Sequence, residues 1–217
     1  TLAAKSQSVV TIYALDHVFA YLGASLIEDF HEACPSIILS VVDTTDAHAI
    51  AALASQQCSF AITAGPLDET RFEGDPLFFS HYSVRMHRSH PLAKLPALTY
   101  DDLDGQTIIS KGRAYDCFRH HIDKYFLAPG RKIHILAETA DESIIRTLLL
   151  HNKAINIGYD YADPLYPHPD IVSRTLKEEI SGQMIYLVSN PQVRKTKAAC
   201  LFRDYLLEWM KEKAAIR

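Results

Sequence analysis

Apolar runs and helical repeats alternate along the first half of the chain. Continuous β-branched and apolar runs are typical of buried strands, and apolar residues three or four positions apart are typical of helices that cover them. These patterns predict strands at residues 9–14, 37–42 and 60–64, and helices at residues 18–33 and 47–56. The order β-α-β-α-β indicates a parallel sheet with right-handed crossovers.

The second half repeats this order with different residues. Strands are predicted at residues 107–110, 132–138 and 154–158, with helices at 115–126 and 141–151 between them. The halves are joined by the segment Arg88-Ser89-His90-Pro91-Leu92-Ala93, which follows a strand at 82–87. Pro91 disfavours helix at the residue before it, so the chain turns there. The pattern predicts an α/β protein of two lobes, each a mostly parallel sheet flanked by helices.

The last part of the chain closes the fold. Residues 171–175 and 184–188 alternate in polarity and are predicted to form an antiparallel pair around Gly182. Residues 195–213 follow as an amphipathic helix. Its apolar stripe is predicted to contain Leu201, Tyr205, Leu206 and Trp209.

Composition excludes several classes of function. The 217 residues are 48% hydrophobic, enough for a real core and unlike a disordered chain. The net charge of −4 has the wrong sign for a chain that wraps nucleic acid by itself.

Cysteine usage and hydropathy bear on the compartment. Cys34, Cys58, Cys117 and Cys200 are far apart and form no C-x-x-C pair, so the sequence indicates neither a zinc knuckle nor a redox motif. Isolated cysteines favour a reducing compartment. Because the sequence also lacks a membrane span and a secretory leader pattern, we expect a cytoplasmic protein without membrane contact.

The order and spacing of several short motifs carry a resemblance to a known family. They are Phe30 with Pro35 before residues 37–39, the strand 60–62, His90-Pro91-Leu92-Ala93, Asp102-Leu103 before 107–109, and Glu138 before the helix at 144–150. Together they resemble the effector-binding domain of LysR-type transcriptional regulators, over almost all of the chain. The resemblance implies the two-lobed type 2 periplasmic-binding-protein fold.

The resemblance also implies how the chain is organised. Lobe I is expected to comprise residues 8–81 plus 189–217 and to carry dimerisation and half of an effector cleft, and lobe II to comprise residues 82–188 and the other half. Such regulators carry an N-terminal winged helix-turn-helix that nothing here matches, so DNA contact is expected only through that missing domain. They assemble as dimers or tetramers, and helix 18–33 with strand 37–42 is the expected antiparallel dimer edge.

Two segments depart from the usual family pattern. Gln56-Gln57-Cys58-Ser59 stands where the family usually has Gly-x-Leu-Asp, and Asn152-Lys153-Ala154 stands where it usually has Gly-x-Gly. Asn tolerates the left-handed backbone that a helix end often needs, so Asn152 is expected to replace the first glycine.

Candidate binding residues follow from a general rule, independently of the resemblance. In open α/β sheets, ligands lie beyond the carboxyl ends of the parallel strands. The residues at these ends are Ala14, Leu15, Asp16, His17, Thr44, Thr45, Ala64 and Gly65 in the first half, and Ser110, Lys111, Arg113, Thr139, Tyr159 and Asp160 in the second. The resemblance places the effector in the same cleft.

Each candidate also has a structural interpretation. Lys111 and Arg113 suit a carboxylate effector, or are solvated loop cations. Asp16 is interpreted first as the N-cap of helix 18–33, and Thr44 and Thr45 also suit capping. Tyr159 is interpreted as stacking on a ligand ring or covering an apolar edge.

No catalytic or metal site is indicated. The sequence contains no G-x-S-x-G, P-loop or H-E-x-x-H motif. His81 and His87 are about 20 Å apart on an extended strand, and His120 and His121 point about 100° apart on a helix, so neither pair suits one metal ion. We therefore expect a domain without cofactor, metal or enzymatic activity.

The sequence is compatible with three functions. The first is the effector-sensing and oligomerisation domain of a bacterial transcriptional regulator, whose lobe angle changes when a small molecule binds. The alternatives are an extracytoplasmic solute-binding protein of a transporter and an enzyme on the same scaffold. We favour the first.

Overall fold

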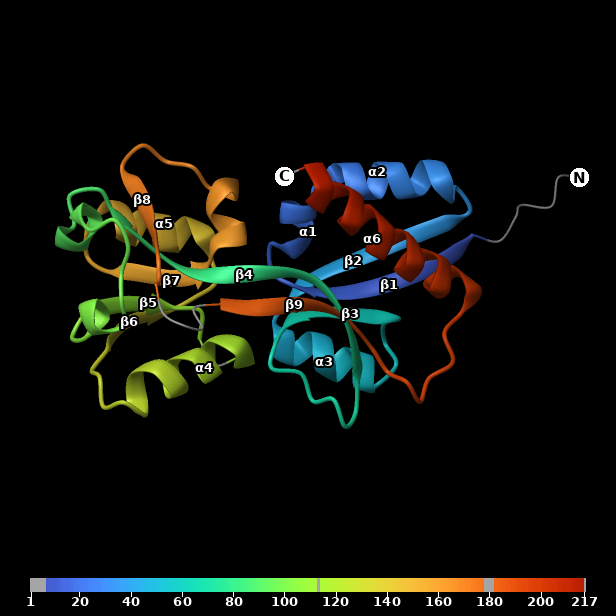
Figure 1. The fold of residues 1–217 in the computed structure, drawn as a ribbon, viewed down its shortest axis with the longest axis horizontal. Coiled ribbons are helices and arrows are strands. Elements are labelled where there is room, and N and C mark those ends of the chain that lie inside the picture. The colour runs from blue at the N-terminus through green and yellow to red at the C-terminus, as the bar shows by residue number, and fades with distance from the viewer. Residues whose placement is uncertain (1–6, 113, 178–181, 217) are drawn as a thin grey trace, which may run out of the picture. The chain divides into compact units, whose positions relative to one another are not determined.

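The computed structural model describes residues 7–112, 114–177 and 182–216. The chain divides into two compact units (Figure 1). Unit 1 contains residues up to Phe78 and from Met184 on, and unit 2 is Phe79–Gln183. The chain passes between the units within β4 (Glu73–His87) and within β9 (Gly182–Ser189). Among the described residues, no helix has the length and apolar character needed to cross a membrane.

Unit 1 is built on parallel strands. Its remaining elements are β1 (Ser8–Leu15), α1 (Val18–Leu22), α2 (Ala24–Ala33), β2 (Ile37–Thr44), α3 (Asp46–Ala54), β3 (Phe60–Ala64) and α6 (Lys197–Ile216). The strand order is β2-β1-β3-β9-β4, with β1 parallel to β2 and β3, and β9 antiparallel to β3. Figure 1 shows α2 and α6 on one side of this sheet and α3 on the other. The predicted parallel β-α-β-α-β order of the first half is confirmed.

The core of unit 1 joins the C-terminal helix to the first strands. All five residues of β3 are buried. Phe30 of α2 and Phe60 of β3 both contact Phe202 of α6, with ring centroids 5.4 Å and 6.1 Å apart. Residues far apart in the sequence therefore form one hydrophobic core.

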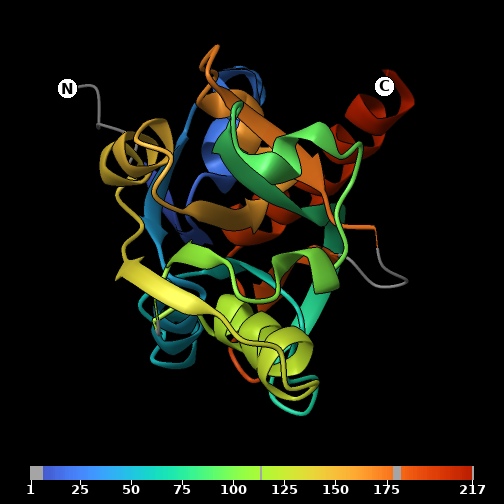
Figure 2. The same ribbon diagram turned by 90° about the vertical axis from the view of Figure 1, so that its left-hand side faces the viewer.

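Unit 2 has a second parallel sheet. Its elements are β5 (Thr107–Ser110), α4 (Asp116–Ile122), a π-helical turn (Asp123–Leu127), β6 (His134–Glu138), α5 (Glu142–Leu150), β7 (Ile155–Tyr159) and β8 (Ile171–Thr175), with 3-10 turns at Pro91–Lys94, Asp101–Leu103 and Asp160–Leu165. The order is β4-β7-β5-β6, and β5 is parallel to β6 and β7. Figure 2 turns unit 2 toward the viewer, with β6 in yellow at the edge of its sheet. The predicted second β-α-β-α-β order is confirmed.

A buried arginine links four elements of unit 2. Arg85 of β4 donates from Nη1 and Nη2 to the two carboxylate oxygens of Glu142, at 2.6 Å and 3.0 Å. It also donates to Oδ1 of Asn156 on β7, and Nδ2 of Asn156 donates to the carbonyl of Ile109 on β5. This network fixes the start of α5 against the sheet, because a buried guanidinium needs its charge and donors matched.

A stack of aromatic rings packs α4 onto the sheet of unit 2. The ring of His121, which is fully buried, stacks on Tyr82 of β4 with centroids 3.8 Å apart. Its Nε2 lies 2.8 Å from the hydroxyl of Tyr100. Desolvation by burial lowers the pKa of His121 from its ordinary value of 6.5 to about 3, so the ring is neutral at pH 7.

Three predicted details of unit 1 are wrong. The helix expected at residues 18–33 is two helices, because Gly23 breaks it with φ 90° and ψ 161°, a conformation that glycine adopts without steric cost. The N-cap of α1 is His17, not Asp16, with φ 66° and no side-chain cap hydrogen bond. Leu201 is 43% exposed, and Phe202 takes its place in the buried stripe of α6.

One predicted strand pair is also wrong. β8 pairs antiparallel with β4 through Ser83–His87, and β9 lies between β3 and β4, antiparallel to β3, so the two strands do not pair with each other. Alternating polarity indicated two strands correctly. It does not identify their partners, because every neighbouring strand has the same two-residue period.

Two left-handed residues occur where the sequence departs from the family pattern. Asn152 has φ 51°, as expected for a substitute for glycine at the end of α5. Gln56 has φ 60° after α3, although its side chain does not favour that region. Both positions therefore have a left-handed backbone in this chain.

The corrected stripe of α6 gives a test of stability. We expect Phe202→Ala to lower the free energy of unfolding by about 3–5 kcal/mol, because it leaves a cavity among Phe30 and Phe60. Leu201→Ala, on the exposed side, should change it by less than about 1 kcal/mol. Urea unfolding followed by circular dichroism measures both, and equal effects would contradict this assignment.

Burial of His121 gives a pH dependence. Its pKa is lower in the folded chain than in the unfolded chain, so below pH 6.5 the unfolded state takes up a proton that the folded state does not. We expect the free energy of unfolding to fall as pH decreases through 6.5, by at most about 1.4 kcal/mol per pH unit from this group. His121→Gln should flatten this dependence between pH 7.5 and 5, whereas His120→Gln, at an exposed site, should not.

Candidate functional site

The three parallel strands of unit 1 end together at one edge of its sheet. Leu15 pairs with Thr44 across β1 and β2, and Ala14 pairs with Ile62 of β3. The edge continues into Ala64 and Gly65, whose amide donates to the carbonyl of Met184 at 3.0 Å. The structure therefore brings together the candidate residues of the first half.

The side chains at this edge differ in what they offer a ligand. Ala14 and Leu15 are fully buried, so their side chains belong to the core. Asp16 is largely buried, and its carboxylate lies 3.2 Å from Nε2 of His17. His17 turns the chain through a left-handed conformation, which places this pair directly beyond the end of β1.

Two threonines precede α3 at the same edge and contact its first turn. Oγ1 of Thr45 accepts a hydrogen bond from the amide of His48 at 3.1 Å, so Thr45 is the N-cap. Oγ1 of Thr44 lies 2.8 Å from Nδ1 of the same histidine. The capping interpretation holds for Thr45, and Thr44 forms a side-chain pair with His48.

The parallel strands of unit 2 also end together. Ser110 of β5 pairs with Glu138 of β6, and the amide of Thr139 donates to the carbonyl of Ser110 at 2.8 Å. Gly112, with φ 92°, turns the chain so that its amide donates to Oγ of Ser110 at 3.2 Å. Oγ1 of Thr139 accepts from the amide of Asp141, the N-cap of α5, at 3.0 Å. A hydroxyl that accepts one hydrogen bond can still donate one, so both side chains retain a donor.

Lys111 contributes the positive charge at the unit 2 edge. Its ammonium lies 5.4 Å from the ring centroids of both Tyr115 and Phe118. Such cation–π contacts hold the lysine near α4. Arg113, the other predicted cation, lies outside the described residues.

The remaining two candidates have structural roles within unit 2. Tyr159 is buried and stacks on Tyr82 and Tyr161, with centroids 5.2 Å and 5.8 Å apart. Its pKa is raised well above 10, chiefly by burial, so the phenol is neutral. Oδ1 of Asp160 accepts hydrogen bonds from Oγ of Ser80 at 2.7 Å and the amide of His81 at 3.1 Å. Its carboxylate is therefore directed to β4.

Sequence reasoning missed the residues that support this edge. Ser80 and His81 anchor Asp160, and the Arg85–Glu142 pair fixes the start of α5. The available signal was Arg85 between Val84 and Met86 in a predicted strand, because a buried cation requires a partner. Among the described residues, no group of His, Cys, Asp and Glu side chains has the arrangement of a metal site.

Comparison with known proteins agrees with this architecture. The effector-binding domain of QuiR in complex with shikimate has a TM-score of 0.82 and 20% identity, covering 95% of this chain and 99% of that chain. The regulatory domain of CcmR from Synechocystis PCC6803 in complex with 2-PG has a TM-score of 0.83 and 15% identity, covering 94% of this chain and 98% of that one. These likenesses confirm the predicted type 2 periplasmic-binding-protein fold.

Sequence comparison identifies the family. The HTH-type transcriptional regulator CysB of Burkholderia cenocepacia is 25% identical over 161 residues, which are 74% of this chain and 51% of CysB. The chain thus spans about half the length of this curated relative. The model of the LysR substrate binding domain matches residues 3–211. The chain therefore belongs to the LysR substrate-binding domain family, as the motifs of its sequence predicted.

Proposed function

We propose that this chain is the part of a LysR-type transcriptional regulator that senses a small-molecule effector. The observation that carries the proposal is that each unit gathers hydrogen-bonding groups at the carboxyl ends of its parallel strands. Such strand ends are where open α/β sheets bind ligands. Membership of the LysR substrate-binding domain family supports the same role.

A carboxylate is the proposed chemical class of the effector. At the unit 2 edge, Lys111 supplies a positive charge and Ser110 and Thr139 supply hydroxyl donors. Asp160 is hydrogen-bonded to β4, which directs its charge away from an approaching anion. The QuiR domain is described in complex with shikimate, itself a carboxylate, so shikimate is a suitable first probe.

Regulation requires that the effector prefer one arrangement of the two units. The proposed effector contacts both strand-end edges, and the chain passes between the units within β4 and β9. A ligand shifts such an equilibrium only by its difference in affinity for the two arrangements. In the complete regulator, a DNA-binding domain preceding this one reads the operator and the assembly is cytoplasmic. Binding without turnover is the expected role of this domain.

A dimer is the proposed oligomeric state of this domain. β2 and β6 are the edge strands of their sheets, and each exposes large apolar residues: Ile38 on β2, and Ile135 and Leu136 on β6. Ile27 of α2 is also exposed. Exposed apolar residues on edge strands favour pairing with another chain, and a two-fold contact closes after two copies.

The alternatives predict different behaviour. A solute-binding protein of a transporter is expected to be a monomer behind a secretory leader, and an enzyme is expected to convert its ligand. The exposed apolar edges favour the regulator over the first. To test the enzyme alternative, the ligand is incubated with the chain for a prolonged time. We expect to recover the ligand unchanged, whereas a converted ligand would favour an enzyme.

Removal of the Lys111 charge tests the effector site. A thermal-shift screen of small carboxylates, shikimate included, should identify a ligand, because one present at 100 times its dissociation constant stabilises the fold by about 2.7 kcal/mol. In calorimetric titration, Lys111→Ala should raise the dissociation constant of that ligand about 10-fold or more. Lys94→Ala, on an exposed turn of unit 2, is the matched control. Unchanged affinity in Lys111→Ala would remove Lys111 from the site.

A charge on the β2 edge tests the dimer. Sedimentation velocity should show a dimer for the chain, and Ile38→Glu should raise its dissociation constant at least about 10-fold, because a buried carboxylate without a partner is costly. Leu201→Glu is the matched control, since both side chains are 43% exposed. A chain that is monomeric at all concentrations would instead favour the solute-binding protein.

A further inference from the structure

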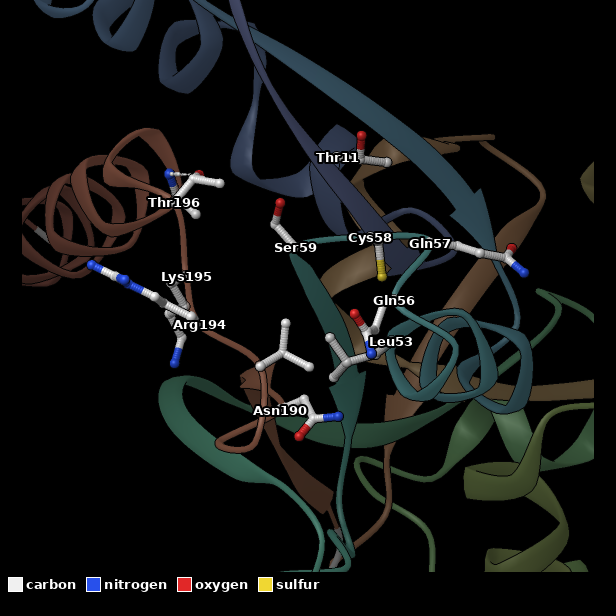
Figure 3. Close-up of a pocket in the computed structure, with 12 residues that line it drawn as sticks. Thr11, Leu53, Gln56, Gln57, Cys58, Ser59, Asn190, Arg194, Lys195 and Thr196 are labelled. Carbon is white, nitrogen blue, oxygen red and sulfur yellow. Dashed lines mark hydrogen bonds between the residues drawn. The ribbon is translucent and has the colours of Figure 1, made fainter.

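A polar cavity of about 300 Å³ lies in unit 1, away from the strand ends described above. Figure 3 shows its two walls facing each other. One wall is the segment from the end of α3 to the start of β3, with Leu53, Gln56, Gln57, Cys58 and Ser59. The other is the connection from β9 to α6, which contributes Asn190 and residues 193–196.

The cavity lies at the amino edge of the unit 1 sheet. Ser59 directly precedes β3, and its amide donates to the carbonyl of Thr11 at 2.8 Å. The candidate effector residue Ala64 lies at the other end of this five-residue strand. At about 3.3 Å per residue, the two edges are about 17 Å apart. A ligand in the cavity therefore does not occupy the effector edge.

The lining has the chemistry of an anion site. It includes two cations, Arg194 and Lys195, and its twelve described residues include no acidic side chain. Lys195 is half-buried, whereas Arg194 is exposed and points away from the cavity in Figure 3. Burial raises the pKa of the Cys58 thiol to about 11, so it is neutral at pH 7 and adds no negative charge. This positive site occurs in a chain whose net charge is −4.

The lining of the cavity also includes neutral hydrogen-bonding groups. Thr11, Ser59, Gln56 and Asn190 line the cavity, and hydroxyl and amide groups can both donate and accept hydrogen bonds. The N-terminal turn of the 20-residue helix α6 adds its positive dipole end beside Lys195. Its first turn is held by Thr196, whose Oγ1 accepts from the amide of Ala199 at 3.1 Å. Such a lining matches a small anion that also carries hydroxyl groups.

We propose that this cavity binds a small hydroxylated anion, with Lys195 as its charge partner, as a second ligand site of the domain. Its volume is at the lower end of the range for small-molecule sites, which restricts the ligand to the size of a short phosphate ester or hydroxy acid. The site lies entirely within unit 1, so it does not depend on the arrangement of the two units.

The test is an amide NMR titration of the whole chain with glycerol 3-phosphate, with inorganic phosphate and glycerol in parallel. We expect saturable shifts at residues 57–59, 190 and 192–196, strong with glycerol 3-phosphate, weaker with phosphate alone and absent with glycerol. Lys195→Gln should weaken binding roughly 10-fold or more, since it removes a charged partner. Lys197→Gln, an exposed lysine two residues further on that does not line the cavity, is the matched control.

Two results would overturn the proposal. One is the absence of saturable shifts in these segments at millimolar glycerol 3-phosphate, and the other is equal affinity in Lys195→Gln and the unsubstituted chain. Lys111→Ala separates this site from the proposed effector site, because it should leave the glycerol 3-phosphate shifts at residues 57–59 unchanged. Thermal unfolding of each variant checks that the fold is intact. The proposals for the second site and for the effector site are therefore tested independently.

Discussion

Parallel pairing of strands is the constraint on which the rest of this domain depends. In unit 1, β1 lies between β2 and β3, and in unit 2, β5 lies between β6 and β7, all parallel. A parallel pair requires a crossover, which here contains one or two helices in each case, so all carboxyl ends meet at one edge and all amino ends at the other. Each sheet consequently has one edge made of strand ends followed by helix starts. Functional groups collect there without any motif that brings them together in the sequence.

The buried polar groups of unit 2 serve this edge indirectly. The Arg85–Glu142 pair holds the first turn of α5, next to Thr139 and Asp141. His121 of α4 stacks on Tyr82 of β4 and so packs this helix, which follows Lys111, onto the sheet. Arg85 is buried, so removal of Glu142 would leave its charge unmatched and destabilise the fold. The position of the residues at the edge therefore depends on contacts in the core. Variants of these core residues are expected to affect stability and binding together.

The two edges of the unit 1 sheet differ in chemistry. The carboxyl edge carries Asp16, which pairs with His17, and the two threonines at the start of α3, which both contact His48. The amino edge carries Lys195 and the neutral side chains around the cavity. If both edges bind ligands, occupation of one leaves the other accessible. The connection from β9 to α6 forms part of the cavity wall, and β9 itself begins in unit 2. A ligand in the cavity would therefore contact the segment that directly follows a strand shared by both units.

The order of strands and helices, the parallel arrangement of each half and the family could be predicted from the sequence, because hydrophobic period, turn residues and short motifs are local signals. The sequence also indicated the left-handed Asn152, since only a few residue types tolerate that conformation. Tertiary structure decided which strands β8 and β9 pair with, which face of α6 is buried and which groups Asp160 and Arg85 contact. It alone revealed the cavity, whose walls are more than a hundred residues apart in the chain, because such partners meet only when the core closes and no local pattern encodes their contact.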